Sequence, residues 1–231
     1  MRDTSLNNVR VDALNVGLRD YMNRVFGYMS AGLMVTALSS FVCASSGIVF
    51  VLLQNPLLLF LVAFSPIFFG WPIMRGKLSA QAAKVCFFVN AALVGLSLSS
   101  ILLVYTSTSI ASAFFVTSSV FLAMTIYGYS TDRDISTWGS ALFMCMLGVI
   151  VASLVGFFVH NSVFHVLLSI ISVVLFSMMT AYDVQILKRE YINNDGRGDR
   201  DVLAVRGALS VYLDFINIFV HIMHLIGVRR D

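Results

Sequence analysis

Asp214 is the residue whose type and surroundings most clearly suggest chemistry. It lies in SVYLDFINIF, residues 210–219, with apolar or aromatic side chains on both sides. A central aspartate costs about 2.5–3.5 kcal/mol to insert into a membrane helix, whereas a Leu or Ile contributes only about −0.3 to −0.6 kcal/mol. On a helix, six polar residues of this region share an arc of about 80°: Arg206, Ser210, Asp214, Asn217, His221 and His224. Phe219 and Ile222 lie outside this arc, so we expect them to face lipid.

A second acid, Asp183, lies on the preceding apolar segment, on one face with His165, Ser169, Ser172 and Thr180. Asp183 precedes Lys188 and Asp214 follows Arg206, which places the two acids roughly 7–8 Å and 12 Å inside the same membrane boundary. The two segments run in opposite directions. We therefore expect the two carboxyl groups to meet at similar depth.

Two neighbouring carboxylates in a low-dielectric medium cannot both ionise cheaply, so they would share a proton. Arg75 ends another apolar segment at the same side, and its guanidinium would favour the charged forms. When ionised, such a site attracts a hard cation such as Ca²⁺, which prefers oxygen ligands. Ser210, Asn217, His221 and His224 could line a hydrated path from Asp214. A static Arg–Asp–Asp network that only fixes helix packing is the alternative.

The composition indicates that these residues lie in an integral membrane protein. Of 231 residues, 58% are hydrophobic and 12% charged, against about 45–50% and about 25% in soluble domains. Apolar runs near 20 residues long predict an all-α fold with seven transmembrane helices, at about 23–46, 55–74, 81–104, 109–129, 137–159, 163–187 and 203–226. These form a single transmembrane domain, residues 23–228, after an N-terminal segment, residues 1–22. The polar stripe predicts that the last helix lies inside the bundle.

The basic residues predict the orientation. All of them except Arg229 and Arg230 fall on the N-terminus or near the loops after the second, fourth and sixth spans. By the positive-inside rule the N-terminus is cytoplasmic and the C-terminus lies outside.

Other chemistries are less well supported by the sequence. The net charge of +3 is too small for a nucleic-acid-binding surface. Cys43, Cys86 and Cys145 are isolated in apolar runs and read as small buried residues. His221 and His224 have a spacing that can hold a metal, or they are packing residues. A zinc-dependent intramembrane hydrolase would need the His and Asp residues at one depth. We expect no enzyme activity, no cofactor and no firm metal site apart from calcium near Asp183 and Asp214.

Several segments together resemble the Bax inhibitor-1 family, also called the transmembrane Bax inhibitor motif family, in its bacterial branch. The resemblance rests on GALSVYLDFINIF at 207–219, TAYDVQILK at 180–188, YGYSTDRDISTWGSALFM at 127–144 and AALVGLSLSSILLVYT at 91–106. It covers residues 19–230 in order and spacing. It implies a seven-helix bundle with the seventh helix at the centre, in a bacterial inner membrane.

The resemblance also implies a function. The family's aspartate pair falls on Asp183 and Asp214, and its latch arginine on Arg75. The expected activity is a pH-sensitive calcium leak, in which the acids sense protons and the arginine holds the sixth-helix aspartate in the closed state. The alternative is a membrane scaffold that regulates a partner, such as a membrane protease or a cell-death factor. The two differ in whether the purified protein passes Ca²⁺.

Overall fold

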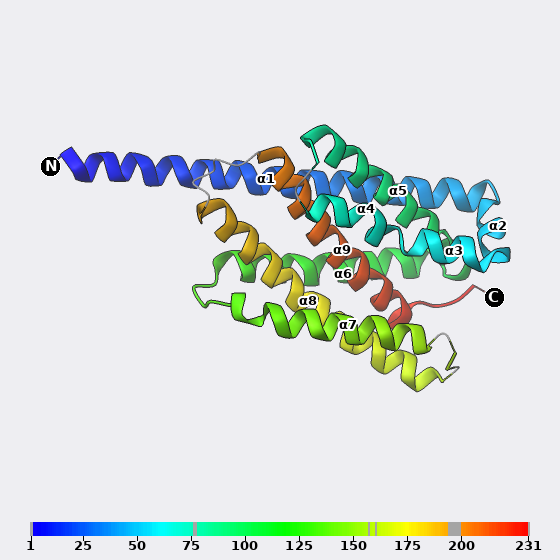
Figure 1. The fold of residues 1–231 in the computed structure, drawn as a ribbon. Helices are drawn as coiled ribbons and strands as arrows, with labels where there is room; N and C mark the ends of the chain where they lie inside the picture. Colours follow the sequence, from blue (N-terminus) through cyan, green and yellow to red (C-terminus); the bar gives the residue numbers. More distant parts are fainter. Residues whose placement is uncertain (1, 76–77, 157, 160, 194–199, 231) are drawn as a thin grey trace. The chain divides into compact units, whose positions relative to one another are not determined.

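The computed structural model describes residues 2–75, 78–156, 158–159, 161–193 and 200–230, with side chains from residue 14 onwards except those of residues 56 and 59. Nearly all of this part of the chain is helical (Figure 1). The helices are α1 (Arg2–Ser45), α2 (Ile48–Gln54), α3 (Pro56–Ala63), α4 (Ser65–Met74), α5 (Ala80–Val104), α6 (Ser107–Ser130), the short 3-10 helix η1 (Ser136–Trp138), α7 (Gly139–Gly156), α8 (Ser162–Asn193) and α9 (Arg200–Ile226).

Six stretches of the described chain are long and apolar enough to cross a membrane: Leu14–Ser45 within α1, α5, α6, Ser136–Gly156, α8 and α9. The predicted all-helical membrane protein is confirmed, whereas the predicted number of seven spans is not. In α9, 44% of the most apolar stretch is buried, the largest share among the six. This agrees with the high insertion cost of its polar stripe, and its central place in the bundle stays a prediction.

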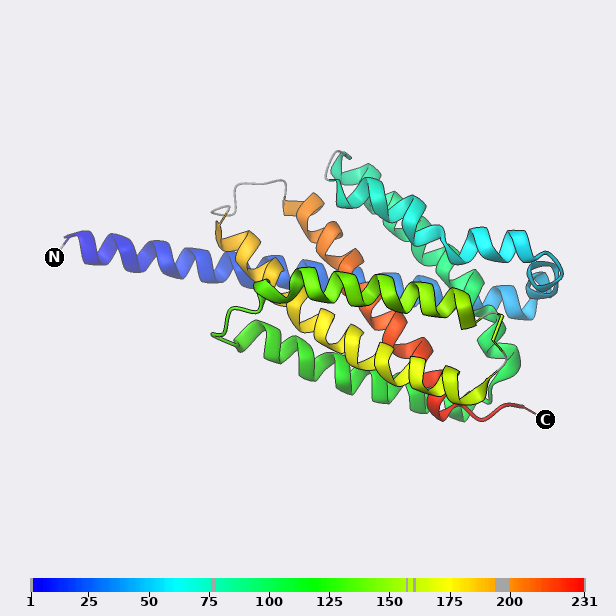
Figure 2. The same cartoon turned by 60° about the horizontal axis from the view of Figure 1, so that its bottom comes forward.

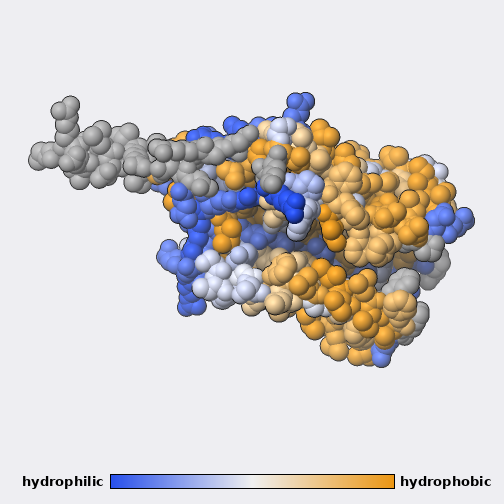
Figure 3. Space-filling model, viewed as in Figure 1, coloured by the Kyte–Doolittle hydropathy of each residue, from blue (hydrophilic) through white to orange (hydrophobic). Residues whose placement is uncertain are grey.

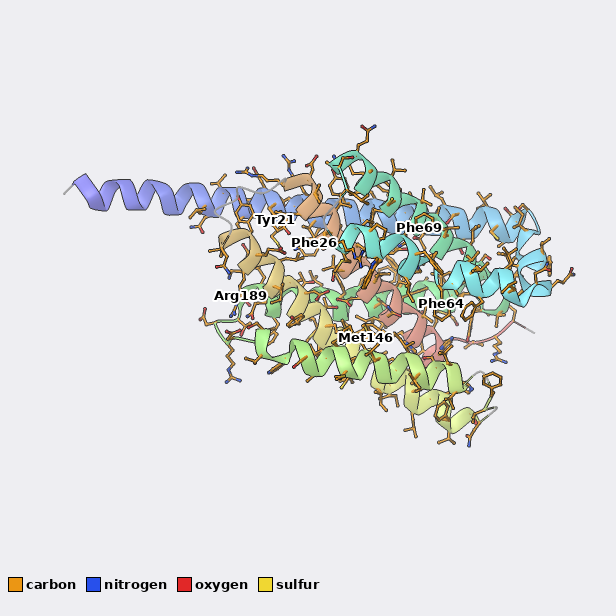
Figure 4. All side chains as sticks on the ribbon, in the orientation of Figure 1. Tyr21, Phe26, Phe64, Phe69, Met146 and Arg189 are labelled. Atoms are coloured by element: carbon orange, nitrogen blue, oxygen red, sulfur yellow. The ribbon has the colours of Figure 1, made fainter. Side chains whose placement is uncertain are left out.

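The second predicted span, 55–74, is divided into α3 and α4 at Phe64, which Figure 4 labels. Pro66 lies in the first turn of α4. Proline has no N–H to bond the carbonyl four residues earlier and disfavours helical geometry at the preceding residue, so one helix ends and another begins. The longest apolar helical stretch here, Phe60–Met74, is shorter than the six candidate spans.

The first helix differs from its predicted start. We expected a span from residue 23 after a separate polar segment, but α1 is continuous from Arg2. No proline interrupts residues 2–22, so nothing there forces the helix to break. The remaining predicted spans match the helices within a few residues, except that α8 continues to Asn193 and so includes Glu190.

The chain divides into two compact units, each described here by itself. Unit 1 comprises residues 1–100 and 187–212. At its core the Thr36 hydroxyl of α1 contacts the Ala91 carbonyl oxygen of α5 (2.9 Å) and the Tyr212 hydroxyl of α9 (2.7 Å). Phe87 packs edge-on against the Tyr212 ring. Tyr21, labelled in Figure 4, stacks on Tyr191 of α8.

Unit 2 comprises residues 101–186 and 213–231, and α6, α7 and α8 form its long helices (Figure 2). Its apolar core joins α6, α7, α8 and α9 through Ala113, Val149, Phe176, Ile218 and Met223. Gly128 of α6 lies directly against the backbone of Ala181, where a Cβ atom would overlap the α8 chain. The two helices can approach this closely only because residue 128 lacks a side chain.

The surface of each unit is strongly apolar. Hydrophobic side chains cover α3 and α4 in unit 1 and α7 in unit 2 (Figure 3). Large exposed residues include Leu57, Phe115 and Met144. Soluble monomers rarely expose continuous apolar area on this scale, so this surface is suited to contact lipid.

Candidate functional site

Asp214 lies on α9 inside unit 2 and is 3% exposed. The Thr180 hydroxyl of α8, which also bonds to the Phe176 carbonyl oxygen (2.9 Å), hydrogen-bonds to the Asp214 carboxyl group. Asp183 interacts with Asp214 electrostatically. The second carboxyl oxygen, Oδ2, is buried and has no hydrogen-bond partner in the described part of the chain. The two acids singled out from the sequence are therefore electrostatic neighbours.

The segment of α8 that carries Asp183 is held on two sides. Ala181 lies against Gly128 of α6. The Gln185 side chain, 3% exposed, donates from Nε2 to the Arg133 carbonyl oxygen (2.8 Å) and accepts from the Ile135 N–H (3.0 Å). These contacts fasten α8 to the α6–α7 connection. They fix the rotation of α8 and with it the direction of Asp183.

The polar face predicted for α8 is largely buried. Ser169, Ser172 and Thr180 are all buried, while His165 at the far end is exposed. The Ser172 hydroxyl donates to the Leu168 carbonyl oxygen (2.7 Å). Hydroxyls that bond back to their own helix can be buried at little cost.

The C-terminal half of α9 carries the other predicted polar residues of unit 2. Asn217 donates to the Leu213 carbonyl oxygen (2.8 Å). His221 stacks on Phe176, and its ring centroid is 5.9 Å from that of the exposed His224. No group of three metal-ligating side chains forms within the described residues, from which His160 is excluded.

One expectation for α9 is wrong. Ile222 was expected to face lipid but is 4% exposed, and Phe219 is partly buried against the same apolar core. These residues, which lie outside the polar stripe, therefore pack inside unit 2.

Arg75, Arg206 and Ser210 belong to unit 1. Arg75 caps the C-terminal end of α4, and its guanidinium carbon lies 4.8 Å from the centroid of the Trp71 ring. This is a cation–π contact within one helical turn. Arg206 pairs with Glu190 of α8. The latch contact between Arg75 and Asp183 stays a prediction.

The sequence interpretation missed an ion network at the start of α9. Asp201 binds Nη1 of Arg24 (2.9 Å) through Oδ1 and Nζ of Lys84 (2.6 Å) through Oδ2. Lys84 also lies over the Tyr28 ring. The three charges are far apart in sequence, and only their positions near the starts of the predicted spans 23–46, 81–104 and 203–226 could have suggested the contact.

Two threonines of α6 were also missed. Thr117 and Thr125 lie in unit 2 one turn to either side of Phe121, and their hydroxyl oxygens are buried without a partner in the described part of the chain. Threonine is common in membrane helices because its hydroxyl can bond to its own backbone. Its presence in the sequence therefore gives no signal of an unpaired oxygen.

The geometry gives unit 2 a buried acid that has one hydroxyl as a hydrogen-bond partner and another acid as an electrostatic neighbour. Such a carboxyl group can hold or release a proton as its surroundings change. The carboxyl and hydroxyl oxygens are ligands that suit water or a hard cation.

Comparison with known proteins agrees with this architecture. The family model described as inhibitor of apoptosis-promoting Bax1 matches residues 18–231. The inner membrane protein YbhL of Escherichia coli strain K12 is 40% identical over 219 residues, covering 93% of this chain and 94% of its own. The uncharacterized protein RP147 of Rickettsia prowazekii is 39% identical over 223 residues, covering 93% and 92%. A membrane-spanning helical chain that matches this model almost throughout belongs to the Bax inhibitor-1 family.

Proposed function

We propose that this protein is a pH-sensitive calcium leak of the membrane, with Asp183 and Asp214 as the proton sensor and Arg75 as the latch. The observation that carries the proposal is the buried Asp214 carboxyl group, which has a second acid as its electrostatic neighbour and one oxygen without a partner in the described chain. The charge of an acid in this position depends strongly on its surroundings, so the acid is better suited to sensing protons than to holding helices in place.

The mechanism follows from charge. When the two acids share a proton, the pair carries one negative charge and attracts cations weakly. When both ionise, carboxylate oxygens become available to a dehydrating Ca²⁺ ion. The Arg75 guanidinium would compensate one carboxylate in the closed state and would have to leave it for the ion to pass.

We propose a bacterial inner membrane as the location, with the N-terminus in the cytoplasm and the C-terminus outside. Membership of an integral membrane family and the inner-membrane designation of YbhL support the location. The distribution of Lys and Arg supports the orientation.

The test is calcium flux into liposomes that contain only the purified protein and a trapped calcium indicator. We expect flux above that of empty liposomes, with a rate that changes between acidic and neutral pH. Flux at background at every pH would refute the leak and leave the regulatory scaffold as the better account. Circular dichroism of the same liposomes would confirm that the protein is helical.

A further inference from the structure

The buried face of α6 carries two polar atoms that the acid pair does not account for. Ala113, Thr117, Phe121, Thr125 and Gly128 follow one another at spacings of three or four residues and so share a face. Ala113 belongs to the apolar core with Ile218 and Met223 of α9, and Gly128 lies against α8. This face is therefore turned into unit 2.

Aromatic contacts place the two threonines near Asp214. The Phe215 ring, next to Asp214 in the chain, packs edge-on against Phe121 (5.5 Å between centroids) and against Phe114 (5.8 Å). Thr117 and Thr125 lie four residues before and after Phe121, roughly 6 Å along the helix in each direction. Asp214 thus lies within reach of the same stretch of α6.

The hydroxyls of Thr117 and Thr125 are unusual for membrane threonines. Each could donate to the carbonyl four residues earlier, as the Thr180 hydroxyl does. Instead both oxygens are buried without a partner among the described residues, and Thr117 is 0% exposed. Oδ2 of Asp214 is in the same situation.

Three unpaired oxygens in one interior are too costly to be left dry, since native proteins pair nearly all such groups with protein or bound water. We propose that Thr117, Thr125 and Oδ2 of Asp214 bind buried water between α6 and α9. The two threonines are roughly 12 Å apart along the axis, so more than one water is required. The Phe121–Phe215 contact divides this water into two groups.

This hydrated site extends the proposed function. The water would form part of the path by which a proton or a hydrated cation reaches Asp214, and this role rests on the proposed calcium leak. The site itself is independent of any flux. A family member that leaked nothing could still contain it, so the two ideas can fail separately.

The decisive measurement is the sign of the change in thermal stability on isosteric substitution. If the hydroxyls are dry, Thr117→Val and Thr125→Val remove an unsatisfied group and raise Tm. If they bind water, valine leaves that water short of a partner and lowers Tm, by about 2–4 °C for a typical lost hydrogen bond in a chain of this size. We expect the decrease. An increase, or no change, would overturn the proposal.

Two control variants show how Tm responds when a hydroxyl group with known hydrogen bonds is removed. Thr36→Val in unit 1 removes a hydroxyl that contacts Gly32, Ala91 and Tyr212, so it must lower Tm. Ser119→Ala removes an exposed hydroxyl on α6 that bonds to its own helix at Phe115, so it should change Tm little. Both are read in the same detergent or nanodisc as the α6 variants.

A second measurement detects the water directly. In solid-state NMR of the full-length protein in lipid, magnetisation transferred from water should reach the methyl groups of Thr117 and Thr125 early and that of Thr36 late. Equal, slow transfer to all three would contradict the hydrated site. Calcium flux of Thr117→Val then decides its role: reduced flux places the water on the path, and wild-type flux with a lowered Tm keeps the site but removes it from the path.

Discussion

Two aspartates of α9 have opposite surroundings. Asp201, in the first turn, contacts the cationic groups of Arg24 and Lys84 and is partly exposed to solvent. Asp214, in the middle of the helix, is buried near another acid and contacts the Thr180 hydroxyl. Neutralised by two cations, the first can only anchor. The second carboxyl group is buried next to another acid, and in the proposed function this difference separates a structural anchor from a proton sensor.

The acid pair gives the largest expected effect. Asp183→Asn and Asp214→Asn each leave a site that can no longer hold two carboxylates, so the pH dependence of calcium flux in liposomes should flatten. Asp201→Asn is the matched control, because it removes an acid of the same helix outside the pair and should keep the wild-type pH profile. A wild-type profile in Asp183→Asn would show that the pair is not the sensor.

The latch gives the next largest effect. Arg75→Ala should raise calcium flux at neutral pH. In the proposed closed state the Arg75 guanidinium compensates the Asp183 carboxylate of α8, and the variant would lose this charge. Arg75→Lys should restore part of the closure, because a single ammonium keeps the charge but not the planar fork. Equal flux in all three proteins at equal incorporation would reduce Arg75 to a topology determinant.

The C-terminal half of α9 tests whether a hydrated route leads from Asp214 to the surface. In a protein without Cys43, Cys86 and Cys145, cysteines at 224, 221 and 217 should react with a water-soluble thiol reagent added outside, in decreasing order of rate. Phe115→Cys on α6, where the native side chain is 71% exposed on the apolar surface, is the lipid-facing control. Reaction at 115 but at none of the stripe positions would show that the stripe is dry.

The difference between Asp201 and Asp214 should also appear in thermal stability, with smaller effects than in calcium flux. Asp201→Asn removes two ion pairs that are partly exposed, so Tm should fall slightly at low salt and hardly at all at high salt. Asp214→Asn removes the cost of burying a titratable carboxyl group beside another acid, so Tm should rise. Matching salt-dependent decreases in both variants would mean that the two aspartates do not differ in role.

Much of the fold could be predicted because insertion into a membrane depends on simple quantities. The length and polarity of α5, α6 and α9 determined their bounds to within a few residues. The break at Phe64 within 55–74 was not predicted, because hydropathy sums do not register Pro66, whose missing N–H acts through backbone geometry. Ile222 was misjudged because a stripe argument assigns one polar face and says nothing about what packs opposite it.

The candidate site was predictable only where a charge made burial expensive. Asp183 and Asp214 stood out because carboxylates are rare in apolar segments. Thr117, Thr125 and Gln185 did not, since uncharged polar residues occur in many membrane helices and their importance depends on which partners the fold supplies. Asp201 looked like an ordinary loop-side acid, and its importance became visible only from its contacts with Arg24 of α1 and Lys84 of α5.

The tail after α9 closes onto the α5–α6 turn. The Thr106 N–H donates to the Val228 carbonyl oxygen (3.1 Å), and the Arg230 N–H donates to that of Val104 (2.8 Å). Tyr105 and Arg229 are thereby paired as in a miniature antiparallel sheet. A reporter protein joined after this tail would thus emerge beside that turn. A single fusion would therefore report the side of the membrane for two distant parts of the chain. If a tag placed within the turn reported the opposite side, the hydrogen bonds between the tail and the turn would have to be absent.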